Sequence, residues 1–263
     1  MVAVGVTVAI ERFGGVVGGL LGTIPTTIVP AAVGIWVASP NPDDLRGAMA
    51  MVPLGMAINA LFLYTWRVLP PRLGGKGWGA LATTTAVGLG IWFGAALLSV
   101  WGMQSYPPDR DVLWVGVWAQ VALIAFGLWA SRAHVPAPKG KRPVGLFTLL
   151  SRGLLAAAAI GFSTWLAALG SPLLAGVASV FPAIFMTTMV SLWLAQGRAV
   201  PLGAVGPMIL GSGSVGVYAL LAAWSLPLTG QVVGSAIAWG GSVVIVTGPA
   251  YVWLRRVRPD EPA

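Results

Sequence analysis

The 263-residue sequence contains no cysteine and only one histidine, His134. Without cysteine, the chain can form no disulfide bond, no thiolate metal site and no cysteine nucleophile. Charged residues are scarce as well, at 8% of the sequence, and only seven of them are acidic. Because Zn²⁺ and Ca²⁺ sites need clusters of histidine, cysteine or carboxylate ligands, we predict no metal site and no cofactor.

Recognisable enzyme motifs are also missing from the sequence. There is no Ser/His/Asp set, no His-Glu-x-x-His pattern and no glycine-rich loop that would hold a phosphate. Hydrolytic and nucleotide-driven reactions therefore have no visible catalytic residues. We predict that the protein is not an enzyme.

Apolar residues, in contrast, are abundant. They make up 57% of the chain, and apolar runs long enough to cross a hydrocarbon core of about 30 Å recur along its length. We therefore predict an all-α, polytopic bundle of transmembrane helices with nine segments, eight of which cross fully and the first of which is short. The predicted segments are 1–10, 14–38, 46–69, 78–102, 112–131, 148–170, 172–196, 199–225 and 228–254.

The net charge of +8 is compatible with nucleic-acid binding, but the order of the charges favours a membrane protein. Thirteen of the fifteen basic residues follow odd-numbered segments or lie in the C-terminal tail, and only Arg46 and Arg110 follow even-numbered ones. Basic residues gather on the cytoplasmic side of membrane proteins. This pattern predicts a multi-pass protein of the cell inner membrane with a cytoplasmic C-terminus, and no nucleic-acid partner.

Two stretches of the chain resemble each other. Residues 14–39 align without a gap on residues 171–196, which pairs Pro25 with Pro182 and Trp36 with Trp193. The following segments pair Asn59 with Gly213. Because the copies start five segments apart, a duplication would be inverted across the membrane. We therefore predict a first repeat over 1–104, a linking helix and basic cytoplasmic linker over 105–147, and an inverted second repeat with its tail over 148–263.

The run Gly19-Leu20-Leu21-Gly22-Thr23-Ile24-Pro25-Thr26-Thr27, followed by a polar loop and a proline-containing helix, resembles the GlpM-like family of small bacterial membrane proteins. The likeness covers mainly residues 11–66 and, more faintly, 171–220. The family's pattern carries no catalytic residues onto this chain. The resemblance implies a bacterial membrane location for an apparently duplicated chain.

Prolines inside two predicted segments mark the candidate site. A proline removes one backbone hydrogen bond and frees a carbonyl, which in lipid must find another partner. Nearby threonine hydroxyls can satisfy such carbonyls in a kinked helix, or they can line a polar site for a substrate. The candidate substrate-binding residues are Thr23, Pro25, Thr26, Thr27, Asn59, Pro182, Thr187 and Thr188.

Three polar residues call for separate interpretations. The amides of Asn59 and Gln120 need buried partners, so both should point inward, either as bonds between helices or, for Asn59, as a substrate contact. Glu11 lies at the end of the short first segment, where it can reach the interface. If that segment is drawn into the membrane, Glu11 becomes the candidate for proton coupling.

These features favour a permease that moves a small neutral, weakly anionic or amphiphilic solute by alternating access between inverted repeats. The alternative is a non-transporting membrane subunit, or a lipid-handling or flippase component of envelope biogenesis, because no convergent charged site is visible. The expected partners are the lipid bilayer and a small-molecule solute. Assembly of the chain into a homo-oligomer is a further expectation.

Overall fold

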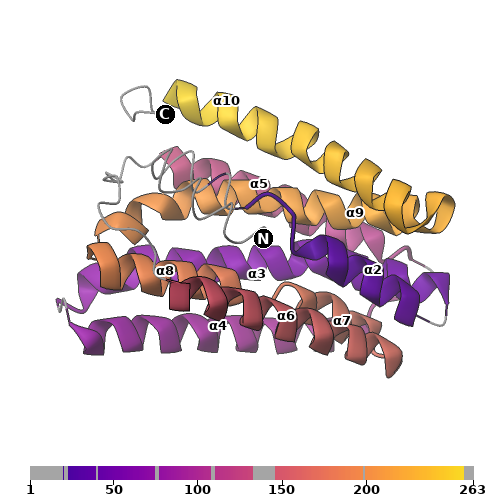
Figure 1. Cartoon of the computed structure of the whole chain (residues 1–263), viewed down its shortest axis with the longest axis horizontal. Coiled ribbons are helices and arrows are strands. Elements are labelled where there is room, and N and C mark those ends of the chain that lie inside the picture. The colour runs from indigo at the N-terminus through magenta and orange to yellow at the C-terminus, as the bar shows by residue number, and fades with distance from the viewer. Residues whose placement is uncertain are drawn as a thin grey trace.

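The computed structural model describes residues 20, 23–39, 41–74, 77–107, 110–132, 146–197 and 199–257, and within these ranges every regular element is helical. Long helices lie roughly side by side and form an elongated bundle (Figure 1). The helices are α2 (Ile28–Ala38), α3 (Pro42–Arg72), α4 (Trp78–Gln104), α5 (Leu113–Arg132), α6 (Leu146–Ala168), α7 (Pro172–Ser179), α8 (Ala183–Gln196), α9 (Ala199–Ser242), η1 (Val243–Thr247) and α10 (Gly248–Val257).

Within the described part of the chain, five helical stretches are long and apolar enough to cross a membrane: Asp43–Arg72, Trp78–Gln104, Leu113–Arg132, Pro172–Leu194 and Pro201–Val257. The all-α fold and the membrane-protein class are therefore as the sequence predicted. The finer count of nine segments and the inverted repeat are not supported by these five stretches. Both remain predictions from the sequence.

Gly230 interrupts the longest helical stretch. Its φ of 79° and ψ of −179° are not helical, and such angles are open to glycine because it has no Cβ. Figure 1 shows the chain reversing direction within α9, before it continues into η1 and α10. Ser225 Oγ donates a hydrogen bond of 2.8 Å to the carbonyl of Gly234 across this reversal. The 57 residues of Pro201–Val257 are thus folded back rather than extended across the membrane once.

The described charges separate toward the two ends of the bundle. The described carboxylates, Asp43, Asp44 and Asp111, lie where α3 and α5 begin, which we call the aspartate end. Most described arginines lie where α3, α5 and α10 end, which we call the arginine end: Arg67, Arg72, Arg132, Arg255 and Arg256. Acidic residues in the first turn of α3 and a basic residue in its last turn also suit the helix dipole.

An ion pair joins two elements at the aspartate end. Arg46 on α3 pairs with Asp111, which precedes α5, at an Nη2–Oδ2 distance of 2.9 Å. The same guanidinium carbon lies 4.7 Å from the centre of the Trp224 ring on α9. Both charged side chains are about a third exposed, at 32% and 41%, so their contribution to stability is small. They nevertheless fix how three helices meet at this end.

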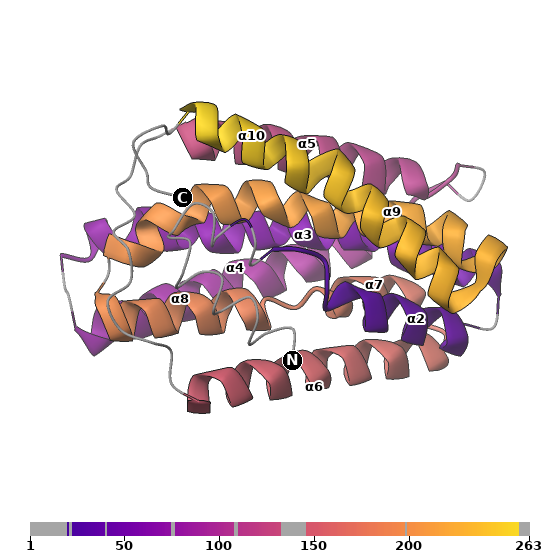
Figure 2. The ribbon, with the colours of Figure 1, turned by 45° about the horizontal axis from the view of Figure 1, so that its top comes forward.

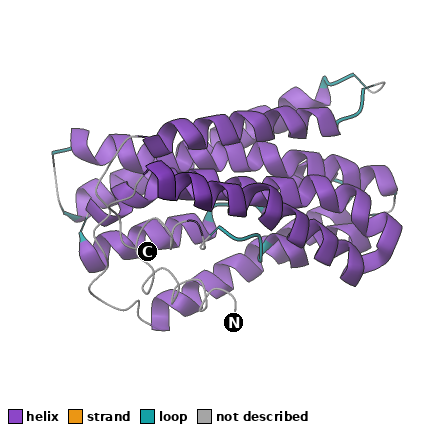
Figure 3. Cartoon of the chain, turned by 90° about the horizontal axis from the view of Figure 1, so that it is seen from above, coloured by secondary structure: helices purple, strands orange, loops and turns teal. Residues whose placement is uncertain are grey.

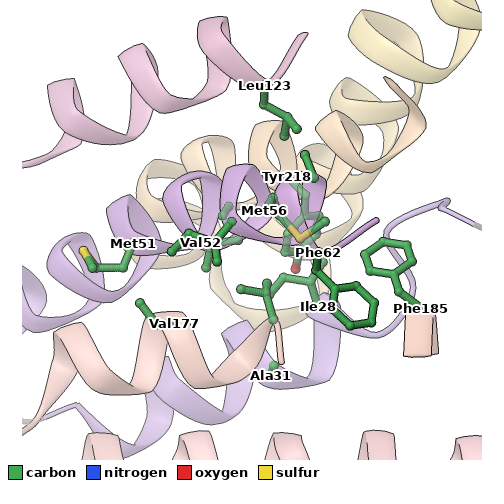
Figure 4. Close-up of a cluster of buried hydrophobic side chains, with 14 of the residues drawn as sticks. Ile28, Ala31, Met51, Val52, Met56, Phe62, Leu123, Val177, Phe185 and Tyr218 are labelled. Atoms are coloured by element: carbon green, nitrogen blue, oxygen red, sulfur yellow. The ribbon is translucent and has the colours of Figure 1, made fainter. Parts of the chain in front are cut away.

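The core forms where α3, α5 and α9 pack together. Apolar side chains from α2, α3, α5, α7, α8 and α9 meet in one cluster, in which Met56, Phe62 and Tyr218 are almost fully buried (Figure 4). Glycines allow the helices to approach closely. A Cβ added to Gly127 of α5 would lie only 2.7 Å from the Leu210 Cα of α9, and one added to Gly116 would lie 2.9 Å from the Ala50 carbonyl oxygen of α3. Such small-residue contacts are how helices pack in lipid.

The outer helices present apolar surface away from this core. On α4, the side chains of Val87, Ile91, Leu97, Leu98 and Trp101 are exposed by 39–69%. Similar exposed side chains lie on α6 and along the part of the chain that follows Gly230. In a soluble protein such continuous apolar surface would be a liability. It is what lipid-facing helices require.

Replacing Gly127 by valine should test the close packing of α5 on α9. The added side chain must push against the backbone of Leu210, and overpacking of this kind costs about 1–3 kcal/mol of folding free energy. We expect the melting temperature of the purified protein to fall by several degrees. Gly90→Val on α4 is the matched control, because a Cβ added there meets nothing within 4 Å. Equal melting temperatures for the two variants would contradict this packing.

Candidate functional site

The first candidate element is a break in the helical structure between Leu20, which is helical, and the start of α2. The described residues of this break, 23–27, form turns, bends and irregular backbone rather than helix. The Thr23 amide donates a hydrogen bond of 3.1 Å to the Leu20 carbonyl, and the Thr26 amide donates one of 2.7 Å to the Ile24 carbonyl. Pro25 is the middle residue of the second turn and has no amide proton to continue a helix. The backbone therefore unwinds at the position where the sequence predicted a proline-broken segment.

A second break separates α7 from α8 and has the same hydrogen bonds. The Val180 amide donates to the Val177 carbonyl at 3.2 Å, and the Ala183 amide donates to the Phe181 carbonyl at 2.7 Å. In the alignment of 14–39 with 171–196, these donors and acceptors are the partners of those in the first break. Pro182 takes the place of Pro25. The two aligned stretches thus share these backbone turns as well as a sequence pattern.

Both breaks lie in the middle of the bundle, next to each other (Figures 2 and 3). From its break, α2 runs 11 residues toward the aspartate end, and α8 runs 14 residues toward the arginine end. At about 1.5 Å per residue these half-helices are roughly 16 and 21 Å long, which is about half and about two thirds of the thickness of a hydrocarbon core. The two helix N-termini therefore approach the middle from opposite directions.

Each break is bonded by a side chain from a long helix of the other half of the chain. Asn59 on α3 donates from Nδ2 to the Val180 carbonyl at 2.7 Å. Ser214 on α9 donates from Oγ to the Thr23 carbonyl at 2.8 Å. Both donors are buried, with exposed fractions of 1% and 0%. Thr23 and Val180 are aligned partners, and Ser214 is next to Gly213, the partner of Asn59. The bonds are therefore reciprocal between the two halves.

The predicted threonines fall into two groups. Thr23, Thr26 and Thr27 lie in the first break, where Thr26 and Thr27 are only partly buried. Thr187 and Thr188 lie within α8, beyond the second break, and the Thr187 hydroxyl donates to the Ala183 carbonyl of its own helix at 2.8 Å.

The other residues of the predicted site are also distributed between the two breaks, except Glu11. Pro25 lies in the first break, and Pro182 lies in the second. Asn59 contacts the second break through its bond to the Val180 carbonyl. Glu11, the candidate for proton coupling, lies outside the described residues. The structure therefore brings the two prolines, Asn59 and the first group of threonines to the breaks, and it places the second group farther along α8.

Gln120 connects two helices, as its burial requires. Its Nε2 donates to the Gly213 carbonyl of α9 at 2.9 Å, and the side chain lies against Gly216, which has no Cβ to exclude it. The sequence predicted this kind of role for Gln120 but indicated no role for Ser214. The sequence did contain an indication of a role for Ser214, because this residue is next to Gly213, which the internal alignment pairs with Asn59.

The breaks offer hydrogen-bond donors and partial positive charge rather than ionised side chains. The first amides of a helix have no intrahelical acceptor, and together they carry roughly half a positive charge. Neither Thr27 before α2 nor Pro182 before α8 provides a side-chain cap. Within the described ranges, no group of three histidine or acidic residues could hold a metal ion. The arrangement suits a neutral or weakly anionic group that accepts hydrogen bonds.

The two reciprocal bonds predict a specific pattern of destabilisation. Asn59→Ala and Ser214→Ala each leave a break carbonyl without its partner, and we expect each to cost about 1–2 kcal/mol. Ser212→Ala is the matched control, because that buried hydroxyl donates only to the Ile209 carbonyl of its own helix, at 2.7 Å. Unfolding in mixed micelles measures the difference. A loss for Ser212→Ala as large as for Ser214→Ala would contradict the role of the bonds.

Comparisons with known proteins identify no relative of this chain. No protein-family model matches the chain, and neither a curated protein nor a solved structure is significantly similar to it. The resemblance to the GlpM-like family therefore stays an expectation from the sequence.

Proposed function

We propose that the protein is a membrane permease that moves a small neutral, weakly anionic or amphiphilic solute by alternating access. In this proposal the halves 1–104 and 148–263 are inverted repeats, joined through 105–147. The nine predicted segments become antiparallel halves of four around the linking helix α5. The solute binds between the two broken segments at the middle of the membrane, where such sites occur in transporters built from inverted repeats.

The observation that carries the proposal is the match between the two breaks. Aligned residues make the same backbone turns, at 3.1 and 2.7 Å in one break and 3.2 and 2.7 Å in the other. Broken helices are tolerated within a membrane only where protein or a water-filled cavity surrounds them. Packing alone does not require two matching breaks beside each other. A solute site would use both.

The chemistry around the breaks supports the class of solute. Two uncapped half-helix N-termini attract the electron-rich part of a solute, and the partly buried Thr26 and Thr27 add hydroxyl groups. The described carboxylates are all at the aspartate end, so none of them would hold a cation at the breaks. These features favour a neutral or weakly anionic group over a metal ion or an organic cation.

The charge distribution supports one orientation. The arginine end carries the last residues of α3, α5 and α10, and by the positive-inside rule we place it in the cytoplasm. We therefore infer a cytoplasmic C-terminus in a bacterial inner membrane. Glu11 stays the candidate for proton coupling in this proposal.

Uptake by proteoliposomes tests the proposal. Purified protein should move at least one member of a radiolabelled panel of short monocarboxylates, polyols and amphiphilic alcohols. Thr27→Val should lower the uptake rate about fivefold or more, the effect of one lost hydrogen bond of about 1 kcal/mol. Thr83→Val on the exposed face of α4 is the control and should leave uptake unchanged. If wild-type protein moves no member of the panel, the non-transporting alternative in envelope or lipid biogenesis gains.

Accessibility of the first break provides a test that needs no known solute. The chain has no cysteine, so Thr26→Cys introduces a single thiol. Alternating access requires that a membrane-impermeant maleimide reach this thiol from each side of the membrane, in separate experiments on oriented vesicles. Gly90→Cys, which faces outward on α4, should stay unlabelled from both sides. Labelling of the Thr26→Cys variant from one side only would argue against alternating access.

A further inference from the structure

A second polar feature lies far from the breaks, at the arginine end between α3 and α5. It is a hollow of about 350 Å³ lined by Tyr64 and Arg67 of α3 and by Trp129, Ala130 and Arg132 of α5. The proposed transport function assigns no role to these residues. Two guanidinium groups and two aromatic side chains thus share one hollow near the ends of two apolar helices.

The described residues around this hollow give it a positive charge. Among those that line it there is no carboxylate. The described acidic residues lie at the aspartate end, and at 1.5 Å per residue Asp44 is about 35 Å from Arg67 along α3. This separation is several times the Debye length at physiological ionic strength. The described lining of the hollow is therefore positively charged and suits an anion.

The walls of the hollow are held in place by contacts between the two helices. Arg67 Nη1 donates to the Ala130 carbonyl at 2.5 Å. The Tyr64 ring lies 5.3 Å from Phe126 and 5.6 Å from Trp129, and the last two rings stack at 5.5 Å between centres. Trp129 is 54% exposed, as expected of a tryptophan at headgroup depth. A fixed aromatic wall and two guanidinium groups are a preformed receptor for a phosphate.

We propose that this hollow binds the phosphate headgroup of an anionic membrane lipid. The lipid source follows from the position of the hollow, which opens between the ends of membrane-spanning helices beside an exposed tryptophan. Basic pockets between transmembrane helices are typical sites for anionic headgroups. Arg132 provides the exposed charge, Arg67 extends from the helix contact, and the lipid chains lie along the apolar outer surface. This site is independent of whether the protein transports a solute.

Native mass spectrometry of the full chain in neutral detergent tests the site. Wild-type protein should retain phosphatidylglycerol at least tenfold better than phosphatidylcholine of the same chain length. Arg132→Gln should weaken phosphatidylglycerol retention about tenfold, since a charged hydrogen bond is lost. Arg132→Lys should keep the preference in weaker form because it keeps the charge.

Arg72→Gln is the matched control. It removes the same charge from the exposed end of α3 but does not line the hollow, and it should retain the lipid like wild type. Equal losses for Arg72→Gln and Arg132→Gln would overturn the proposal in favour of general surface attraction. Displacement of the lipid by millimolar inorganic phosphate would also overturn it, because the site would then favour a soluble anion. Retention of both lipids alike would contradict it as well.

Discussion

The constraint that organises this protein is the need to satisfy backbone polar groups where helices are broken inside an apolar bundle. An unpaired carbonyl in hydrocarbon destabilises the fold. Here the Thr23 and Val180 carbonyls receive hydrogen bonds from Ser214 and Asn59. Because each donor belongs to the long helix of the other half, neither break can be satisfied by its own half alone. The two halves of the chain therefore depend on each other at their least regular positions.

The packing of the other helices holds the donors Ser214 and Asn59 in position beside the two breaks. Glycines bring α5 against both α3 and α9, and Gln120 bonds α5 to α9 at Gly213, beside Ser214. The ion pair between Arg46 and Asp111 fixes the aspartate end. The arginine end is held by the bond from Arg67 to the Ala130 carbonyl. Long helices thus surround two short half-helices and give the breaks a defined place in the bundle.

Much of the fold could be predicted from particular residues. The apolar runs predicted helices that suit a membrane, and Pro25 and Pro182 predicted the two breaks. Burial of the Asn59 and Gln120 amides predicted partners on other helices. The contribution of Ser214 could not be predicted, because serine is common in membrane helices and usually bonds to its own helix, as Ser212 does. The position of Thr187 was also beyond prediction, since its bond to Ala183 depends on where α8 begins.

The fold and the proposed site depend on one spatial relation. The long helix of each half lies against the break of the other half. Cross-linking measures it directly, because the natural chain has no cysteine. A Cβ at Gly211 would lie 3.3 Å from the Thr23 Cβ, and one at Gly55 would touch the Val180 side chain, close to the Cβ separation of a disulfide. With a protease site in the 133–145 linker, we expect mild oxidation in membranes to hold the cleaved fragments together in Thr23→Cys/Gly211→Cys and in Gly55→Cys/Val180→Cys. The fragments of the control Gly90→Cys/Gly211→Cys should separate, and separation of both test pairs would contradict the relation.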